Sequence, residues 1–464
     1  MAFDGFVEKA VIEELNSVLT YGKVQKVFEP TKNEIILGIY SAGHNYALVI
    51  NIASNQCYMH LTTTAKPNPL VAPNFCMLLR KHLLGSKIVS ITNLGLERIA
   101  EITFETYNEL NDIVTKKLMV ELMGKHSNLI LVNENNTIID SLRHLEKEEH
   151  SVRDILPARQ YVLPPITKAN LLSISSFDEF CSILQQKQIS SLEDISAGFS
   201  GISKSMLQYL QKKLDLTTLS SASLKALWTE LQHILSCMTT HHIVLEPIRD
   251  GKDYVLETTL TASNSLCINW FLDDFYTAKE KAETFTQYRN TVLKLILAKL
   301  KKLSKKLEGI NSKLAECEKI DTYRMYGELL TANLYQLPKE NTSSVTVSNY
   351  YENGKEITIP LDPKLTPSAN SKAFFKKYHK LKNTLEIVEK QKQETKQEMD
   401  YLESIVYELE SSDTIQAVDA IYEEMVENGV VERKEKTSSK VKKVKNNPRL
   451  PSKIGTAVRR TALL

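Results

Sequence analysis

The stretch LKLILAKLKKLSKKLEGINSKLAEC, residues 293–317, decides the architecture that we expect for this chain. Its apolar residues recur at alternating spacings of three and four, and lysines fill much of the space between them. That spacing is typical of the seam along which one helix of a coiled coil packs against another. The seam residues are Leu293, Ile296, Leu300, Leu303, Leu307, Ile310, Leu314 and Cys317.

A second seam follows further along the chain. Its residues are Phe374, Tyr378, Leu381, Leu385, Val388, Lys392, Thr395, Met399, Leu402, Val406 and Leu409. The two predicted helices can pair antiparallel, because the segment 320–370 between them is short and contains VTVSNYY and EITIPL around Asn353-Gly354. An Asn-Gly pair between alternating apolar residues strongly favours a β-hairpin. We therefore expect a long two-helix arm with a small folded tip.

The sequence before the arm predicts an antiparallel α+β domain followed by a helical region. Residues 1–20 show the apolar stripe of an amphipathic helix, and residues 72–84 predict a second helix. Short helices joined by serine-rich turns are expected over residues 167–240, and two strands with a short helix over 243–276. Further strands are expected at 23–29, 34–40, 46–52, 56–62, 87–93, 98–106, 118–122, 128–132 and 137–142.

The composition limits the class of protein. With 464 residues, 42% hydrophobic and 25% charged, the chain is typical of a folded protein of about three domains, which excludes a fully disordered one. The net charge of +2 hides two basic segments, residues 277–319 and 433–464. Basic faces attract phosphate-rich partners, although the lysine-rich exterior of a coiled coil is often only a solvated surface.

The cysteines and the N-terminus carry little functional signal. The six cysteines form no Cys-x-x-Cys pair and have no histidine in ligand spacing, so we expect no metal, no cofactor and no disulfide framework. The start MAFDGFVEKAVIEELNSVL is acidic early, unlike a secretory signal, and no apolar run approaches ~18 residues. We therefore expect a cytoplasmic protein without a membrane partner.

No catalytic pattern emerges from the sequence. The motifs GxxxxGK[ST], GxGxxG and His-Glu-x-x-His do not occur, and His126 and His144 lie in no catalytic or metal-binding spacing. We therefore expect that the protein is not an enzyme. Glu121, Lys125 and His126 gather around Gly124 at the end of a predicted strand. Such a turn is either a binding surface or a charged turn that only solvates a hairpin.

The turn GFSGIS, residues 198–203, lies between two predicted helices. Gly198 and Gly201 permit a tight turn, and Ser203 is a suitable N-cap for the helix that follows. Helix-hairpin-helix modules use such turns to bring backbone N–H groups close to a phosphate. A glycine turn between helices is also a common simple connection.

Eight segments, in order, resemble the NFACT family. They are MAFDGFVEKAVIEEL, APNFCMLLRKHLLGSKI, LGLERIAEITFE, ELMGKHSNLILV, RDILPARQYVLPP, YGELLTANLYQLP, IPLDPKLTPSAN and FFKKYHKLK. The resemblance covers residues 1 to about 435. It implies an α+β multidomain protein with a β-sandwich-like antiparallel NFACT-N domain, which is similar in fold to the N-terminal domain of formamidopyrimidine-DNA glycosylases.

The resemblance also implies how the chain is divided. The expected parts are an NFACT-N domain (1–170), a helix-hairpin-helix region (171–242), a connecting segment (243–276), a first coiled-coil helix (277–319), a middle tip domain (320–370), a second coiled-coil helix (371–410), an acidic helical segment (411–432) and a basic linker with a truncated tail (433–464).

The function that the resemblance implies is ribosome-associated quality control. Members of the family bind a large ribosomal subunit that still holds a stalled peptidyl-tRNA, through its rRNA and ribosomal proteins. They recruit aminoacyl-tRNA, in bacteria mainly alanyl-tRNA, and direct untemplated C-terminal alanine tailing that marks the nascent chain for degradation. Because peptidyl transfer belongs to the ribosome, the protein would position tRNA and would not catalyse the reaction.

The family's motifs imply a set of contact residues. The expected tRNA-binding residues are Asp4, Glu97, Arg98, Glu121, Lys125, His126 and Asn128, and RNA backbone contacts are expected at Arg80, Lys81, Gly198 and Gly201. The family's Asp-Arg pair matches Glu97-Arg98 here, so the carboxylate lies one methylene further out. Arg98 can still donate in a forked pattern to a phosphate or a base edge.

The end of the sequence departs from the family pattern, which continues into an NFACT-R domain. This chain ends NNPRLPSKIGTAVRRTALL, so we expect that domain to be absent and tailing to be impaired, whether through a frameshift, a truncation or a natural short form. Two other functions stay open. One is a fibronectin-binding surface adhesin, and the other is a nucleic-acid binder like the DNA-repair glycosylases, although the N-terminal proline nucleophile of those enzymes is missing.

Overall fold

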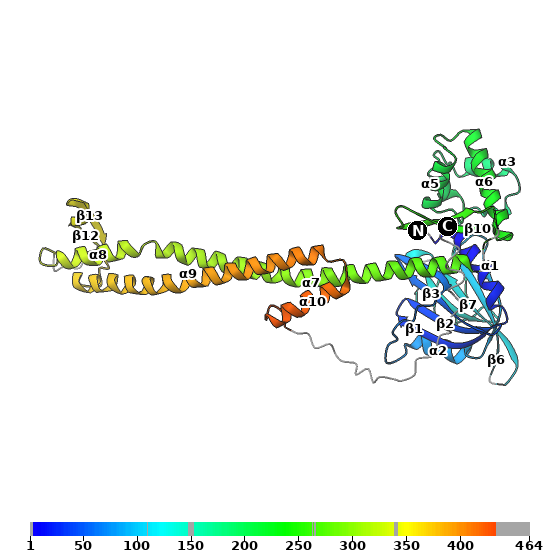
Figure 1. The fold of residues 1–464 in the computed structure, drawn as a ribbon, viewed down its shortest axis with the longest axis horizontal. Helices are drawn as coiled ribbons and strands as arrows, with labels where there is room; N and C mark the ends of the chain where they lie inside the picture. Colours follow the sequence, from blue (N-terminus) through cyan, green and yellow to red (C-terminus); the bar gives the residue numbers. More distant parts are fainter. Residues whose placement is uncertain are drawn as a thin grey trace. The chain divides into compact units, whose positions relative to one another are not determined.

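The computed structural model describes residues 3–108, 110–146, 153–261, 263, 266–337 and 342–432. These residues form two compact units, of which the first runs to Lys279 and the second begins at Glu280. Figure 1 shows the elements of both units. The predicted basic linker and tail, residues 433–464, lie outside the described residues.

The first unit is built on one antiparallel sheet in the order β4-β3-β2-β1-β5-β6-β7-β8-β9. Every neighbouring pair is a hairpin except β1 and β5, which join two meanders at the middle of the sheet. All of the predicted strands are present, although β7 begins at Ile113, five residues before the predicted start at 118. Their bounds are β1 Lys23–Thr31, β2 Glu34–Ser41, β3 His44–Ala53, β4 Gln56–Leu61, β5 Lys87–Asn93, β6 Ile99–Tyr107, β7 Ile113–Glu121, β8 Asn128–Asn133 and β9 Ile138–Ser141.

In place of two facing sheets, this single sheet folds back so that its two ends meet. Arg143, just after β9, donates to the Asn33 side chain at 2.8 Å and to the Ile52 carbonyl in β3 at 2.9 Å. Near the same closure, the Cys57 thiol in β4 donates to the Leu122 carbonyl after β7 at 3.4 Å. These are side-chain contacts, and the sheet itself stays open, with β4 and β9 as its two ends.

Two helices cover the sheet, α1 (Gly5–Leu19) and α2 (Asn74–Leu83). The sequence predicts an amphipathic α1, but this helix is buried on nearly every side, and even Glu8 and Glu14 are shielded from solvent. The reason is that α1 contacts strands β2, β4 and β5 of the sheet and also β11 of the next region. A helix covered on both sides cannot keep a solvated polar face.

A helical region and a two-stranded hairpin complete the first unit. Phe180, Phe199 and Trp228 stack at its centre, with ring centroids 4.7 and 5.2 Å from that of Phe180. Its elements are η2 Leu171–Ser173, α3 Phe177–Gln186, α4 Ile195–Gly198, α5 Lys204–Lys213, α6 Ser221–Thr239, β10 Ile243–Ile248 and β11 Asp253–Thr258. The long helix α7 (Cys267–Cys317) then begins in the first unit and continues into the second.

The carboxylate of Glu14 in α1 holds the first turn of α7. It accepts hydrogen bonds from the backbone N–H groups of Ile268 and Asn269, both at 3.0 Å, and from the Asn269 amide at 2.7 Å. Asn269 in turn accepts from the Leu61 N–H in β4 at 2.9 Å. A carboxylate at a helix N-terminus satisfies amides that have no partner within the helix.

The second unit contains two long antiparallel helices, α7 and α9 (Pro367–Ser411), and both predicted seams are confirmed by burial. The most buried seam positions recur every seven residues, except that Leu381, between Phe374 and Val388, is half-buried. Lys299 in α7 pairs with Glu398 in α9 at 3.2 Å. The buried positions are Ile296, Leu303, Ile310 and Cys317 on α7, and Phe374, Val388, Thr395, Leu402 and Leu409 on α9.

A third helix, α10 (Ile415–Glu427), packs against this pair, which the seam pattern did not predict. Val418, Ile421 and Met425 are buried among Val292 and Ile405, two residues outside the seams. The Tyr288 hydroxyl donates to the Asp419 carboxylate at 2.7 Å. The apolar face of α10 therefore extends the helix pair to a small three-helix core.

The predicted tip is also confirmed. It contains helix α8 (Ile320–Ala332) and the hairpin of β12 (Ser344–Asn349) and β13 (Lys355–Pro360), with the short η3 (Tyr350–Glu352) between the strands. Asn353 and Gly354 both have positive φ, +53° and +81°, as the Asn-Gly signal requires. The tip core includes Leu330, Ile359 and Phe374, so the base of the tip is the start of α9.

The first prediction concerns Glu14. Glu14→Ala leaves the buried N–H groups of Ile268 and Asn269 without their acceptor, and we expect it to cost about 2–4 kcal/mol of the free energy of unfolding of the first unit. Both tryptophans, Trp228 and Trp270, lie in that unit, so fluorescence during urea unfolding reports on it alone. The control is Glu13→Ala, which removes only the ion pair with Lys9 and should cost under about 1 kcal/mol.

The second prediction concerns Thr395, which is fully buried in the seam and whose hydroxyl has no hydrogen-bond partner in the structure. Thr395→Val keeps the shape and the β-branch but removes the stranded hydroxyl, so thermal melting by circular dichroism should show a gain of about 1 kcal/mol. Thr291→Val is the control, because that exposed hydroxyl is bonded to the Gln287 carbonyl at 2.8 Å. A loss of stability in Thr395→Val would contradict the prediction.

Candidate nucleic-acid interface

Two stretches that lie apart in the sequence meet at one end of the sheet. Glu97 and Arg98 precede β6, and the short helix η1 (Gly124–His126) follows β7. Ile99 pairs with Glu121 across the two strands, and the Leu122 N–H donates to the Arg98 carbonyl at 2.8 Å. The β6–β7 register therefore places the predicted contacts Glu97, Arg98, Lys125 and His126 on neighbouring loops.

The N-terminus of α1 adjoins the same region. Asp4 caps α1 by accepting from the Val7 N–H at 3.1 Å, and its other oxygen accepts from the Ser203 N–H at 3.3 Å. A Cβ at Gly5 would lie 1.9 Å from the Leu96 carbonyl oxygen, so only glycine permits this approach. The start of α1, the loop before β6 and the turn before α5 thus pack directly on one another.

Arg98 lies in the field of three carboxyl groups, and two of them are buried. Burial raises the pKa of Asp4 to about 6, against the opposing effects of the Ser203 and Val7 hydrogen bonds and of the Arg98 charge. Burial also raises the pKa of Glu8 well above its ordinary value, and neither oxygen of Glu8 has a hydrogen-bond partner in the structure. Burial without a hydrogen-bond partner thus favours the neutral form of Glu8.

Glu97 and Lys168 form the outer part of this group. Burial raises the pKa of Glu97, while the charges of Lys168 and Arg98 act in the opposite direction. Burial lowers the pKa of Lys168, which donates to the Ser196 carbonyl at 2.8 Å. The longer glutamate side chain at position 97 therefore interacts with two cations, Lys168 and Arg98.

The predicted contact residues differ in how much solvent they meet. Lys125 and His126 are exposed on η1, and Glu97 and Arg98 are half-buried. Asp4 is buried at the N-cap of α1. These positions present the positive charges of Arg98 and Lys125, together with the His126 ring, at this end of the sheet, where they suit a polyanion.

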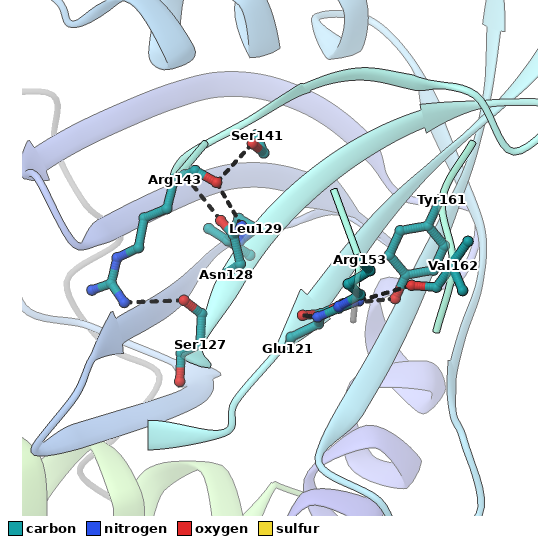
Figure 2. A network of polar contacts seen from close by, with 9 residues as sticks. All are labelled: Glu121, Ser127, Asn128, Leu129, Ser141, Arg143, Arg153, Tyr161 and Val162. Atoms are coloured by element: carbon teal, nitrogen blue, oxygen red, sulfur yellow. Dashed lines mark hydrogen bonds and ion pairs between the residues drawn. The ribbon is translucent and has the colours of Figure 1, made fainter. Parts of the chain in front are cut away.

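Glu121, another predicted tRNA contact, is fully buried and bonded within the protein (Figure 2). One oxygen accepts from the Arg153 guanidinium and from the Tyr161 hydroxyl, both at 2.8 Å, and the other accepts from Arg153. Arg153 also donates to the Val162 carbonyl at 2.8 Å. In this conformation Glu121 ties the segment 153–162 to β7, and it offers no oxygen to a partner outside.

Asn128 is buried as well, in a second network (Figure 2). Its amide donates to the Arg143 carbonyl at 2.7 Å, and its oxygen accepts from the N–H groups of Arg143 and Leu129. Arg143 itself donates to the Ser127 carbonyl at 3.0 Å. Asn128 therefore shapes the β8–β9 end of the sheet from inside, and direct contact with tRNA would require its exposure.

The glycines of the turn 198–203 are explained by packing. A Cβ on Gly198 would lie 2.4 Å from Ile189, and one on Gly201, where φ is +92°, would lie 2.8 Å from Leu96. The N–H groups of Ser200 and Ser203 are already bonded, to the Ala169 carbonyl and to Asp4. The predicted RNA contact at Gly198 and Gly201 stays a prediction, and no feature of the turn supports an open phosphate cradle.

Arg80 and Lys81 lie elsewhere, in the last turn of α2. Arg80 is half-buried and donates to the Val27 carbonyl at 2.9 Å, whereas Lys81 is exposed. Sequence reasoning did not single out Arg143, Arg153 or Lys168, because their partners lie 15 or more residues away. Neither a group of three metal-ligating side chains nor a helix suited to crossing a membrane occurs within the described ranges.

The third prediction uses the Asp4 pKa. The folded protein holds a proton on Asp4 up to about pH 6, whereas the unfolded chain releases it near 3.8, so the contribution of Asp4 to stability falls as the pH rises between these values. Asp4→Asn should flatten the fall in unfolding free energy between pH 4 and 7 by about 3 kcal/mol. The control is Asp112→Asn, which removes a carboxylate at an exposed turn away from the α1 cap.

Comparison with known proteins identifies the family. The family model described as NFACT N-terminal and middle domains matches residues 4–444. The Rqc2 homolog RqcH of Bacillus subtilis is 33% identical over 457 residues, which are 96% of this chain and 78% of that protein. The RqcH of Streptococcus suis is 32% identical over 442 residues, 94% of this chain and 76% of the relative.

More distant relatives cover less of the chain. The human ribosome quality control complex subunit NEMF is 25% identical over 145 residues, 31% of this chain and 13% of NEMF. Among solved structures, the fibrinogen binding protein from Staphylococcus aureus is 28% identical, with a TM-score of 0.50 over 60% of this chain and 99% of that one. The family match and the RqcH relatives together show that this chain belongs to the NFACT family.

Proposed function

We propose that this protein acts in the quality control of stalled ribosomes, in the cytoplasm, by binding RNA and without catalysing a reaction itself. The observation that carries the proposal is the relationship to RqcH over 96% of the chain. The name of the related NEMF, a ribosome quality control complex subunit, supports the same process. The half-buried Arg98 and the exposed Lys125 and His126 supply a surface suited to the phosphates of RNA.

In this proposal the protein binds a large ribosomal subunit that carries peptidyl-tRNA and recruits a second tRNA, alanyl-tRNA, for untemplated tailing. Arg98 donates to a phosphate or a base edge, because its guanidinium forms paired hydrogen bonds. Lys125 and His126 contact the backbone from η1. Asp4, Glu121 and Asn128 act indirectly, since their burial and bonding fix the loops that present Arg98, Lys125 and His126.

Glu97 has a specific role in the proposal. It interacts with both Arg98 and Lys168, so it limits where the guanidinium of Arg98 can lie. The extra methylene relative to the aspartate of the family's pair lengthens that link. We infer that Glu97→Asp strengthens tRNA recruitment, while Glu97→Gln weakens it by releasing both cations.

A second function follows from the Staphylococcus aureus structure, whose name describes a fibrinogen binding protein. An adhesin of this kind requires the chain to meet host protein outside the cell. The two functions can be compared directly. Binding of the purified protein to immobilised fibrinogen is measured in competition with large ribosomal subunits. Retention on fibrinogen with no co-sedimentation with subunits would favour the adhesin.

The fourth prediction tests the interface. Arg98→Ala should weaken binding of alanyl-tRNA about tenfold, by fluorescence anisotropy, because it removes one charge-assisted contact. The slope of log affinity against log salt should become less steep by about one, as expected for the loss of a phosphate contact. The matched control is Arg249→Ala, since Arg249 is exposed in the β10–β11 turn of the same unit and should leave both quantities unchanged.

Two further measurements keep this test decisive. Tryptophan fluorescence during unfolding shows whether Arg98→Ala only destabilises the first unit, and the double variant Lys125→Ala/His126→Ala repeats the test at exposed residues. Co-sedimentation with large subunits that carry peptidyl-tRNA tests the ribosome itself. If the wild type binds subunits and tRNA, and all three alanine substitutions leave that binding intact, the assigned interface is wrong.

A further inference from the structure

A second group of cations lies where α2 meets the core side of β7, apart from the loops that carry Arg98 and Lys125. Lys116 of β7 donates a hydrogen bond to Nδ1 of His82 at 3.0 Å. His82 belongs to the last turn of α2, beside the exposed Lys81. The structure therefore gathers three basic side chains from two elements that are more than 30 residues apart.

The positive charge of this group is not balanced by an ion pair with a described carboxylate. Burial lowers the pKa of His82, and the charges of Lys116 and Lys81 lower it further. Burial and the Lys81 charge likewise lower the pKa of Lys116. Within the described part of the chain, no carboxylate forms an ion pair with any of the three.

The carboxylates on neighbouring elements form hydrogen bonds or ion pairs with other residues. Glu29 of β1 accepts from the Cys76 N–H near the start of α2, at 3.1 Å. Asp140 of β9 pairs with His144 at 2.6 Å. Glu101 of β6 pairs with Lys117, whose side chain points to the opposite face of β7 from Lys116 because successive residues alternate in a strand.

Helix α2 accounts for only part of this arrangement. The C-terminal end of a helix favours cations, which explains Lys81 and His82. Lys116, however, comes from a strand and is half-buried against an already cationic group. Holding like charges together in a partly desolvated site destabilises the free protein. Binding of an anion would relieve this repulsion, and charged groups with shifted pKa values are often found at binding sites.

We propose that Lys81, His82 and Lys116 form a second phosphate-binding site that takes a backbone phosphate of RNA, separate from the interface around Arg98. The Nζ of Lys116 and the ring of His82 contact the phosphate from the side of the sheet, and Lys81 contacts the phosphate from the end of α2. The site rests on the proposed function for the identity of its polyanion, since the geometry itself specifies a phosphate group. With two separated sites, the first unit holds an RNA backbone at two points.

The fifth prediction separates this role from a structural one. Lys116→Met keeps the length of the side chain but removes the charge, so it should raise the stability of the first unit and also weaken alanyl-tRNA binding about threefold to tenfold. If Lys116 had only a structural role, Lys116→Met would lower the stability of the first unit and leave tRNA binding unchanged. Tryptophan fluorescence during urea unfolding and anisotropy with labelled tRNA measure the two effects on the full chain.

The matched control is Lys117→Met, one residue away on the other face of β7. It breaks the ion pair with Glu101, which spans 3.1 Å, so it should slightly lower stability and leave tRNA affinity unchanged. Equal loss of affinity in both variants would refute a specific site, because it would reflect only the net charge. His82→Asn should also weaken binding, since it removes the ring that Lys116 contacts.

Inorganic phosphate provides a test of the site that does not depend on the ribosomal function. Titration with phosphate should shift the ring NMR signals of His82 toward the protonated form in wild type and not in Lys116→Met, with sodium chloride at equal ionic strength as the reference. If the wild type binds no tRNA, the proposed function fails, and this titration alone decides whether the anion site exists. Absence of a phosphate-specific shift at His82 would overturn the site.

Discussion

The arrangement of the first unit depends on one buried carboxylate, that of Glu14. It lies in α1 and accepts three hydrogen bonds from the first turn of α7, while Asn269 of that turn binds β4. The same α1 presents Asp4 at its other end, beside the loop that carries Arg98. The long helix and the candidate interface are thus fixed to opposite ends of a single helix that solvent barely reaches.

The parts of the fold that could be predicted are those with a local signal. The seams of α7 and α9 follow from spacing along one helix, and the tip hairpin follows from Asn353-Gly354. The packing of α10 was not predictable in this way, because its partners Val292 and Ile405 lie outside the heptad pattern. The burial of Glu8 was also hidden, since an amphipathic stripe does not show that a second layer covers the polar side.

The candidate site shows the same division. The family motifs identified Arg98, Lys125 and His126, and the β6–β7 register explains why they are neighbours. The motifs could not separate groups that touch a partner from groups that support them. Only burial and bonding show that Glu121 and Asn128 are engaged with Arg153 and Arg143 inside the domain. Those partners lie far along the chain, so no spacing in the sequence reveals them.

The heptad burial of α7 and α9 has a further consequence for the second unit. A slide of one helix along the other by less than a repeat would take the seam side chains out of the spaces that they fill on the partner helix, so this packing fixes the register of the pair. Each repeat of seven residues corresponds to about 10 Å of helix length. The next register that keeps both seams matched therefore lies one whole repeat away, so small displacements along the helix axis are disfavoured.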